Sequence, residues 1–186
     1  MSVVMDWVDA IETTPTIGDL NEAVQAVLSR DLLSKKEKER HEPSDHKTTG
    51  HCAIASEALM HLLRIFYPTL KTKPMCATYR EQPSQRGQVH FTPWAKGEHD
   101  ESERETHWWL ECSYRAQPCF TLDPTGHQYW SRLQSPPYRY GVGKGFQGRK
   151  CKVTGQQLPT KRASIVINRV LERIAVQQCG ATPKTY

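Results

Sequence analysis

The stretch Gly50-His51-Cys52-Ala53-Ile54-Ala55-Ser56-Glu57-Ala58-Leu59 decides how the rest of the chain can fold. After a glycine-led loop, apolar residues recur at the spacing of one helix face, and Pro68 closes the run. The residues that define this face are Ile54, Ala55, Ala58, Leu59, Leu62, Leu63 and Phe66. The pattern predicts a core helix that begins at Cys52 and ends before Pro68.

The place of Cys52 within that helix bears on chemistry. A thiol at a helix start lies among backbone N–H groups that have no intrahelical acceptor, at the positive end of the helix dipole. Both features favour the nucleophilic thiolate, and the same amides could hold a developing oxyanion. The alternative is a small buried core residue, because free cysteine is among the most buried residue types. A nucleophile also needs a base, so Cys52 alone leaves both interpretations open.

Length and composition limit the class of protein. The 186 residues suit one domain whose core needs no disulfide bonds. No apolar run approaches the length of a membrane span, and residues 1–12 contain acids where a signal peptide would be basic. The six cysteines include no CxxC pair. We therefore expect reduced thiols in a soluble, cytoplasmic protein without membrane contact, and the oligomeric state stays open.

Charge is divided unevenly along the chain. Residues 1–33 hold six acids and one base, whereas residues 132–186 hold eleven bases and one acid. A basic region of this kind could contact nucleic acid or an acidic partner. The alternative, which we prefer, is a solvated face that also neutralises the acidic N-terminal part.

The order of the remaining patterns, helices first, then strands, then a helix, predicts an α+β fold. We expect a single domain over 1–186, with a helical N-terminal part over 1–45 and a catalytic-type core over 48–178. The predicted elements beside the Cys52 helix are a short helix over 3–12, a helix capped by Asp19 with apolar positions to Leu32, a charged extension over 34–40, a strand over 70–80, a hairpin of strands over 107–112 and 119–123, and a basic amphipathic helix over 159–178.

Two long segments lie between these elements. Residues 81–105, which include the acidic segment 97–105, are too many for a plain connection, so they form a lid over a site or are locally disordered. Residues 124–150 are rich in Gly, Pro and Tyr and predict an ordered loop wrapped on the body through its aromatic side chains.

The hairpin carries two residues of catalytic type. His107 opens its first strand and Asp123 closes its second. In an antiparallel hairpin these ends lie side by side, so the carboxylate could reach the imidazole. With Cys52 on a helix packed against the sheet, the three would form a nucleophile, its base and the group that orients the base. Taken alone, His107 could be a structural strand residue and Asp123 a turn former.

The motifs also resemble a known group of enzymes. GHC at a helix start, HWWLEC on a strand and TLDPTG at the end of the next strand are similar to the transglutaminase-like (papain-like) cysteine enzyme superfamily. More narrowly, GHCxxASEAL, HWWLE, LDPT, PPY, GxGxGF and PTKRAS resemble a small bacterial and phage group called YunG-like, over residues 48–170. The resemblance implies a papain/transglutaminase-like fold, with N-terminal helices and a nucleophile helix packed on a small antiparallel sheet.

The resemblance implies roles as well: Cys52 as nucleophile, His107 as general base and acid, and Asp123 as orienting carboxylate. The implied activity is that of a cysteine hydrolase or acyltransferase acting at an amide of a protein or peptide-like substrate, since hydrolysis and transfer share every step. Candidate oxyanion donors are the Cys52 backbone N–H and the side chain of Gln82 or His51. No cofactor is expected.

Two other interpretations use different residues. A metal site would draw on His41, His46, His51, Cys52, His107, Cys112 and Cys119, but no pair has structural zinc spacing, so we expect no metal. Nucleic-acid binding would use YRYGVGKGFQGRK at 138–150, whose composition suits stacking and phosphate contact. The rival function is therefore a non-catalytic interaction protein of phage or mobile-element type, which binds a host protein or nucleic acid through its basic C-terminal face.

Overall fold

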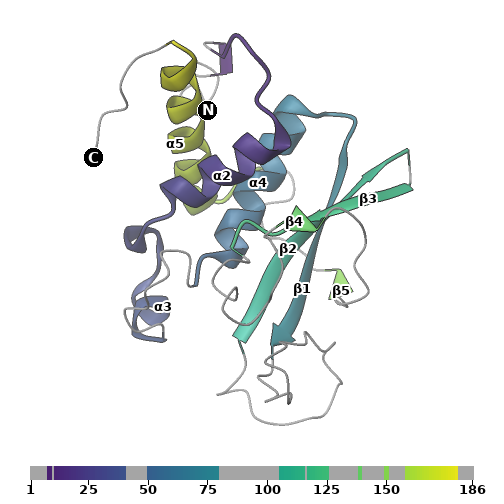
Figure 1. Cartoon of the computed structure of the whole chain (residues 1–186). Helices are drawn as coiled ribbons and strands as arrows, with labels where there is room; N and C mark the ends of the chain where they lie inside the picture. The colour runs from purple at the N-terminus through teal and green to yellow at the C-terminus, as the bar shows by residue number, and fades with distance from the viewer. Residues whose placement is uncertain are drawn as a thin grey trace.

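The structure, a computed structural model, describes residues 8–9, 11–40, 50–79, 105–115, 117–125, 138–139, 149–150 and 158–179. Within these residues the fold is α+β, as predicted, and the helices gather on one side of an antiparallel sheet (Figure 1). The elements are α2 (Ile17–Val27), the 3-10 helix η1 (Arg30–Leu32), α3 (Lys35–Arg40), α4 (Cys52–Phe66), β1 (Lys71–Tyr79), β2 (Glu105–Tyr114), β3 (Gln117–Leu122), β4 (Tyr138–Arg139), β5 (Arg149–Lys150) and α5 (Lys161–Gln178).

The helix α4 is the centre of the molecule. Every residue from Ile54 to Leu63 is buried, so the helix is covered all round rather than on one face. It packs against β1 and β2 on one side and against α2 and α5 on the others. Each fully buried aliphatic side chain in this core contributes roughly 1.5–3 kcal/mol through burial, which fixes α4 within the domain. The predicted start at Cys52 and end before Pro68 are confirmed.

The helix α2 begins differently from the prediction. Its N-cap is Thr16, whose Oγ1 accepts a hydrogen bond from the Asp19 N–H at 3.1 Å. Asp19 lies three residues inside and accepts from the Thr16 N–H at 2.9 Å, which completes a capping box. The predicted cap at Asp19 is therefore wrong by one turn. The helix also ends at Val27, and Leu32, which continues the apolar period, lies in η1.

The sheet has the strand order β4-β3-β2-β1-β5 and is antiparallel throughout. β1 pairs with β2 along its full length, from Lys71 opposite Ser113 to Tyr79 opposite Glu105. The predicted hairpin of β2 and β3 is confirmed but is tighter than expected, because β2 runs to Tyr114 and β3 begins at Gln117. Arg115 turns the chain with φ at 49°, a left-handed conformation that is uncommon outside glycine.

Both faces of β2 are covered near its middle. Leu110 belongs to the core that the sheet shares with the helices, as does Leu122 opposite it on β3. Trp109 lies on the other side of the pleat, where it and its cross-strand partner Met75 are also buried. A solvent-accessible site on this sheet must therefore lie at an end or an edge rather than over the middle of β2.

Some predictions concern residues outside the described ranges. These are the helix over residues 3–7, the acidic segment before Glu105, Gln82, and most of the loop over 126–148. Among the residues that the structure does describe, none of the helices has the length and apolar character needed to cross a membrane.

Candidate functional site

Cys52 is the first residue of α4 and differs from the residues that follow it. Gly50 turns the chain into the helix with φ at 79°, in the left-handed region that favours glycine. The Ala55 N–H donates the first helical hydrogen bond to the His51 carbonyl at 2.8 Å. Cys52 is partly exposed, whereas Cys112 is 2 % exposed and belongs to the core. The interpretation of Cys52 as a buried core cysteine is therefore wrong; Cys112 has that role.

The N-terminus of α4 lacks a side-chain cap from its N-cap residue. α2 and α5 begin with Thr16 and Thr160, and each threonine oxygen accepts a hydrogen bond from a first-turn N–H. His51 makes no such bond, and the first turn of α4 contains no acidic residue. The N–H groups of residues 52–54 have no intrahelical acceptor, and their dipoles add to the positive end of the helix. This is the environment in which a cysteine thiolate or an oxyanion is stabilised.

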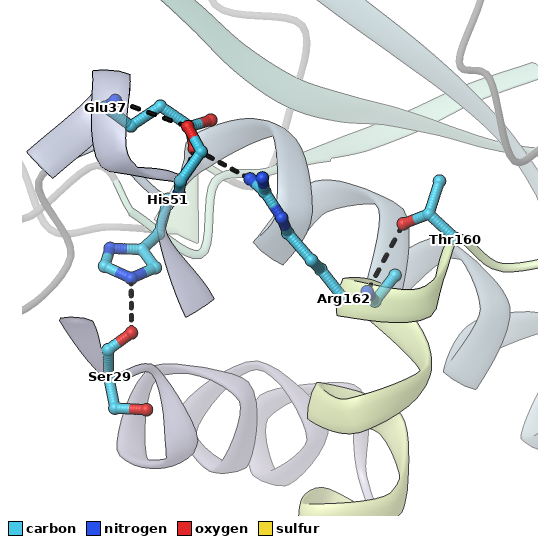
Figure 2. A network of polar contacts seen from close by, with 7 residues as sticks. Ser29, Glu37, His51, Thr160 and Arg162 are labelled. Atoms are coloured by element: carbon cyan, nitrogen blue, oxygen red, sulfur yellow. Dashed lines mark hydrogen bonds and ion pairs between the residues drawn. The ribbon is translucent and has the colours of Figure 1, made fainter. Parts of the chain in front are cut away.

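The imidazole of His51 is turned toward another part of the chain (Figure 2). It is 1 % exposed, and its Nε2 lies 2.8 Å from the Ser29 carbonyl oxygen. A carbonyl only accepts, so Nε2 carries the proton, and a neutral imidazole has a single N–H. The Nε2–H of His51 is therefore engaged by Ser29, and the role of His51 as an oxyanion donor stays a prediction. Gln82, the other candidate, is outside the described residues.

His107 is the third residue of β2 rather than its first, because the strand begins at Glu105. Its Cα pairs with that of Ala77 on β1. The structure describes the strand at this position, while the imidazole lies outside the described part. The placement of His107 in the hairpin is thus confirmed, and its contact with Cys52 stays a prediction.

Asp123 follows β3 directly and is 4 % exposed. Its Oδ1 accepts a hydrogen bond from the Thr125 N–H at 3.1 Å, with the Thr125 hydroxyl 3.5 Å away. This is an Asx turn, so the interpretation of Asp123 as a turn former is confirmed. A carboxylate has two oxygens with about four acceptor sites, so the turn is compatible with a second role toward an imidazole.

Chain connectivity sets the direction of the elements that carry these three positions, while the meeting of Cys52 with the other two stays a prediction. α4 ends at Phe66 and β1 begins at Lys71, so the start of α4 is directed toward the end of β1, where β2 begins (Figure 1). Leu122 pairs with Leu110, and Asp123 lies one residue closer to His107 along the ladder. Roughly 7 Å of strand rise separates the levels of Asp123 and His107.

A buried carboxylate on α4 forms a feature that sequence reasoning missed. Glu57 is 6 % exposed; its Oε1 accepts from the Thr160 N–H at 2.6 Å and its Oε2 from the Thr160 hydroxyl at 3.1 Å. Thr160 is itself the N-cap of α5, since its Oγ1 accepts from the Ala163 N–H. Glu57 therefore anchors α5 on α4 at the positive end of the α5 dipole. An acid among apolar helical positions is the signal that could have revealed it.

The arginines of α5 meet the acids of the N-terminal part. Arg162 Nη1 lies 2.7 Å from Glu37 Oε2, and Arg169 Nη2 lies 3.1 Å from Asp31 Oδ2. Burial alone would raise the pKa of Glu37, but hydrogen bonds from Ser34 and Arg162 outweigh it and hold that pKa below its ordinary value. These contacts support the interpretation of the basic region as a face that neutralises the N-terminal acids.

The pKa of Asp31 is also held below its ordinary value, first by the hydrogen bond from the Ser29 hydroxyl and then by Arg169, against the effect of burial.

Within the described residues, no three His, Cys, Asp or Glu side chains gather so as to hold a metal ion. His41 and His46, which the metal interpretation used, lie outside those residues.

No family model, curated protein or solved structure matches the chain. The resemblance of its motifs to the transglutaminase-like superfamily therefore stays a prediction.

Proposed function

We propose that the protein is a thiol-dependent acyl-transfer enzyme that acts on an amide of a protein or peptide-like substrate. Cys52 is the nucleophile, His107 the general base and acid, and Asp123 the carboxylate that orients the imidazole. The fold we propose is papain/transglutaminase-like. The observation that carries the proposal is a partly exposed cysteine at a helix N-terminus that its own N-cap residue leaves without a side-chain cap.

The reaction uses these three groups in two steps. The Cys52 thiol passes its proton to His107, and the sulfur attacks the carbonyl carbon, so that a C–S bond and an oxyanion form. The imidazolium then protonates the amide nitrogen, the C–N bond breaks and the amine leaves. Water or a second amine, deprotonated by His107, attacks the thioester and releases the thiol. The N–H groups at the start of α4 are the candidate donors to the oxyanion.

The packing of the sheet constrains where these groups can meet. Leu110 and Leu122 fill the side of β2 and β3 that faces the helices, and Trp109 is buried on the other side. His107 lies two residues before Trp109 and so has the same strand parity. The triad we propose therefore needs the His107 imidazole to reach round the start of β2 to the first turn of α4, with the substrate amide approaching from that end.

Competitive alkylation tests this proposal within a single sample. Iodoacetamide labelling followed by peptide mapping gives the rate at Cys52 relative to Cys179, an exposed thiol at the end of α5. We expect Cys52 to react about tenfold faster than Cys179 or more, because a thiolate is the reacting form. His107→Ala should reduce the ratio toward one, and the neighbouring Thr106→Ala should leave it unchanged.

Asp123→Asn gives a matched test of the carboxylate. Asparagine keeps the side-chain oxygen that accepts from Thr125 and removes the charge, so the turn is kept and the orienting group is weakened. We expect an intermediate ratio with an unchanged melting temperature. Equal rates at Cys52 and Cys179 in the unaltered protein would instead favour the non-catalytic interaction protein.

A further inference from the structure

The segment that precedes η1 contacts both α4 and α5. The Ser29 carbonyl accepts the hydrogen bond from His51 Nε2, at the start of α4. The Ser29 hydroxyl accepts from Arg169 Nη1 of α5 at 2.8 Å and donates to Asp31, whose Oδ2 accepts from Arg169 Nη2 at 3.1 Å. We refer to Ser29, Asp31, His51 and Arg169 as the Ser29 bridge.

The bridge holds His51 in one orientation. The imidazole is 1 % exposed, so its Nε2–H has no water to replace the Ser29 carbonyl, and a buried donor without an acceptor is strongly unfavourable. Figure 2 shows the ring pointing toward Ser29 and away from the axis of α4. The side chain that could have capped α4 is therefore engaged elsewhere, and the backbone of residue 51 is fixed with φ at −98° and ψ at 0°.

Cys52 is bonded directly to this fixed residue. Any rotation at His51 would move the sulfur and the first-turn N–H groups together, because the peptide plane between the two residues is rigid. Arg169 acts one step further away: it holds the Ser29 hydroxyl and the Asp31 carboxylate, and thereby the position of the carbonyl that His51 binds.

We propose that His51 and Arg169 are positioning residues for the Cys52 nucleophile, acting through Ser29. This inference rests on the proposed function, since it assigns to the Ser29 bridge the task of holding the sulfur and the adjacent amides in their reactive arrangement. It also explains why a helix N-terminus carries histidine at a position where serine, threonine, aspartate and asparagine are the usual residues.

Two substitutions of His51 separate positioning from plain packing. His51→Leu keeps a buried side chain of similar size and removes the donor, whereas His51→Gln keeps an N–H at the reach of Nε2. We expect His51→Leu to lower the Cys52-to-Cys179 alkylation ratio about tenfold and His51→Gln to restore it to within about twofold. The pH dependence of Cys52 alkylation should become that of Cys179 in His51→Leu.

Arg169 supplies a second test at a side chain that is 41 % exposed and so tolerates change. Arg169→Gln should lower the ratio about threefold, and Arg173→Gln, one turn further along the same helix, should leave it unchanged. Melting curves identify which variants are folded, and if His51→Leu does not fold, the comparison of Arg169→Gln with Arg173→Gln decides.

The outcomes distinguish this inference from the proposed function. A high ratio in the unaltered protein that persists in folded His51→Leu and in Arg169→Gln would overturn the inference alone. A ratio near one in the unaltered protein would overturn the proposed function and the inference with it. A fall in His51→Leu with recovery in His51→Gln would support both.

Discussion

The N-termini of α4 and α5 lie in the same helical layer and are built in opposite ways. α5 begins at Thr160, which caps its first turn and is in turn bound by the buried carboxylate of Glu57. α4 begins beside His51, which gives no side-chain cap and donates instead to Ser29. The partly exposed cysteine stands at the second of these ends.

The difference teaches how one chain can use the same local structure for stability and for chemistry. A filled cap satisfies the first N–H groups of a helix and stabilises it by about 1 kcal/mol. An anion that is to bind at a helix N-terminus needs those groups to be available. The α5 start thus serves the packing of the domain, and the α4 start suits the proposed reaction.

The largest expected effect on stability concerns the capped N-terminus of α5. Glu57→Leu would leave the N–H and the hydroxyl of Thr160 without their buried acceptor, so we expect the free energy of unfolding to fall by about 2–4 kcal/mol. Glu57→Gln keeps one acceptor oxygen and should lose less. Urea denaturation measures both. Because Glu57 binds the start of α5, the Cys52-to-Cys179 alkylation ratio should be unchanged in the variants that fold. A lower ratio with no loss of stability would show that Glu57 acts on the start of α4 instead.

The second-largest expected effect on stability comes from Thr160, the N-cap residue of α5. Thr160→Val keeps the shape of the side chain and removes the oxygen that accepts from Ala163, which should cost about 1–2 kcal/mol of unfolding free energy. Thr160→Ser keeps the oxygen and should be near neutral. Thr16→Val applies the same change to the exposed cap of α2, where we expect about 1 kcal/mol or less. An equal loss at both caps would show that Glu57 adds nothing to the α5 cap.

The smallest effect is the pH dependence of the ion pairs that join α5 to Asp31 and Glu37. The pKa values of both carboxyls are lowered in the folded state, so their contribution to stability is fully present above the ordinary values, 3.8 and 4.5. It is lost as the pH falls below these values and through the lower pKa values of the folded state. Both carboxylates are partly solvated, so each pair contributes less than about 1 kcal/mol. Arg162→Gln should reduce the acid-induced loss of stability, as measured by denaturation at pH 7 and pH 3. An unchanged pH dependence would contradict the assignment to Glu37.

Much of the fold could be predicted because its signals are local. The start of α4 at Cys52, the pairing of β2 with β3, and the amphipathic α5 all follow from apolar spacing within a few residues. The misplaced cap of α2 shows the limit of this approach. Thr16 and Asp19 are both good capping residues, and only the backbone at residue 16 decides which one is the N-cap.

The sequence by itself determined where α4, α5 and the strands β1, β2 and β3 form, because side-chain periodicity reports which face of an element is buried. It also determined that a cysteine begins the central helix. It did not reveal β4 and β5, which lie in a segment predicted to be an ordered loop, because two-residue strands carry no periodicity. Only the tertiary structure decided that Glu57 binds Thr160, that Arg169 binds Asp31, and that His51 turns to Ser29. These pairs join elements that are far apart in the chain. The periodicity of one element does not indicate which polar group from another element will lie beside it.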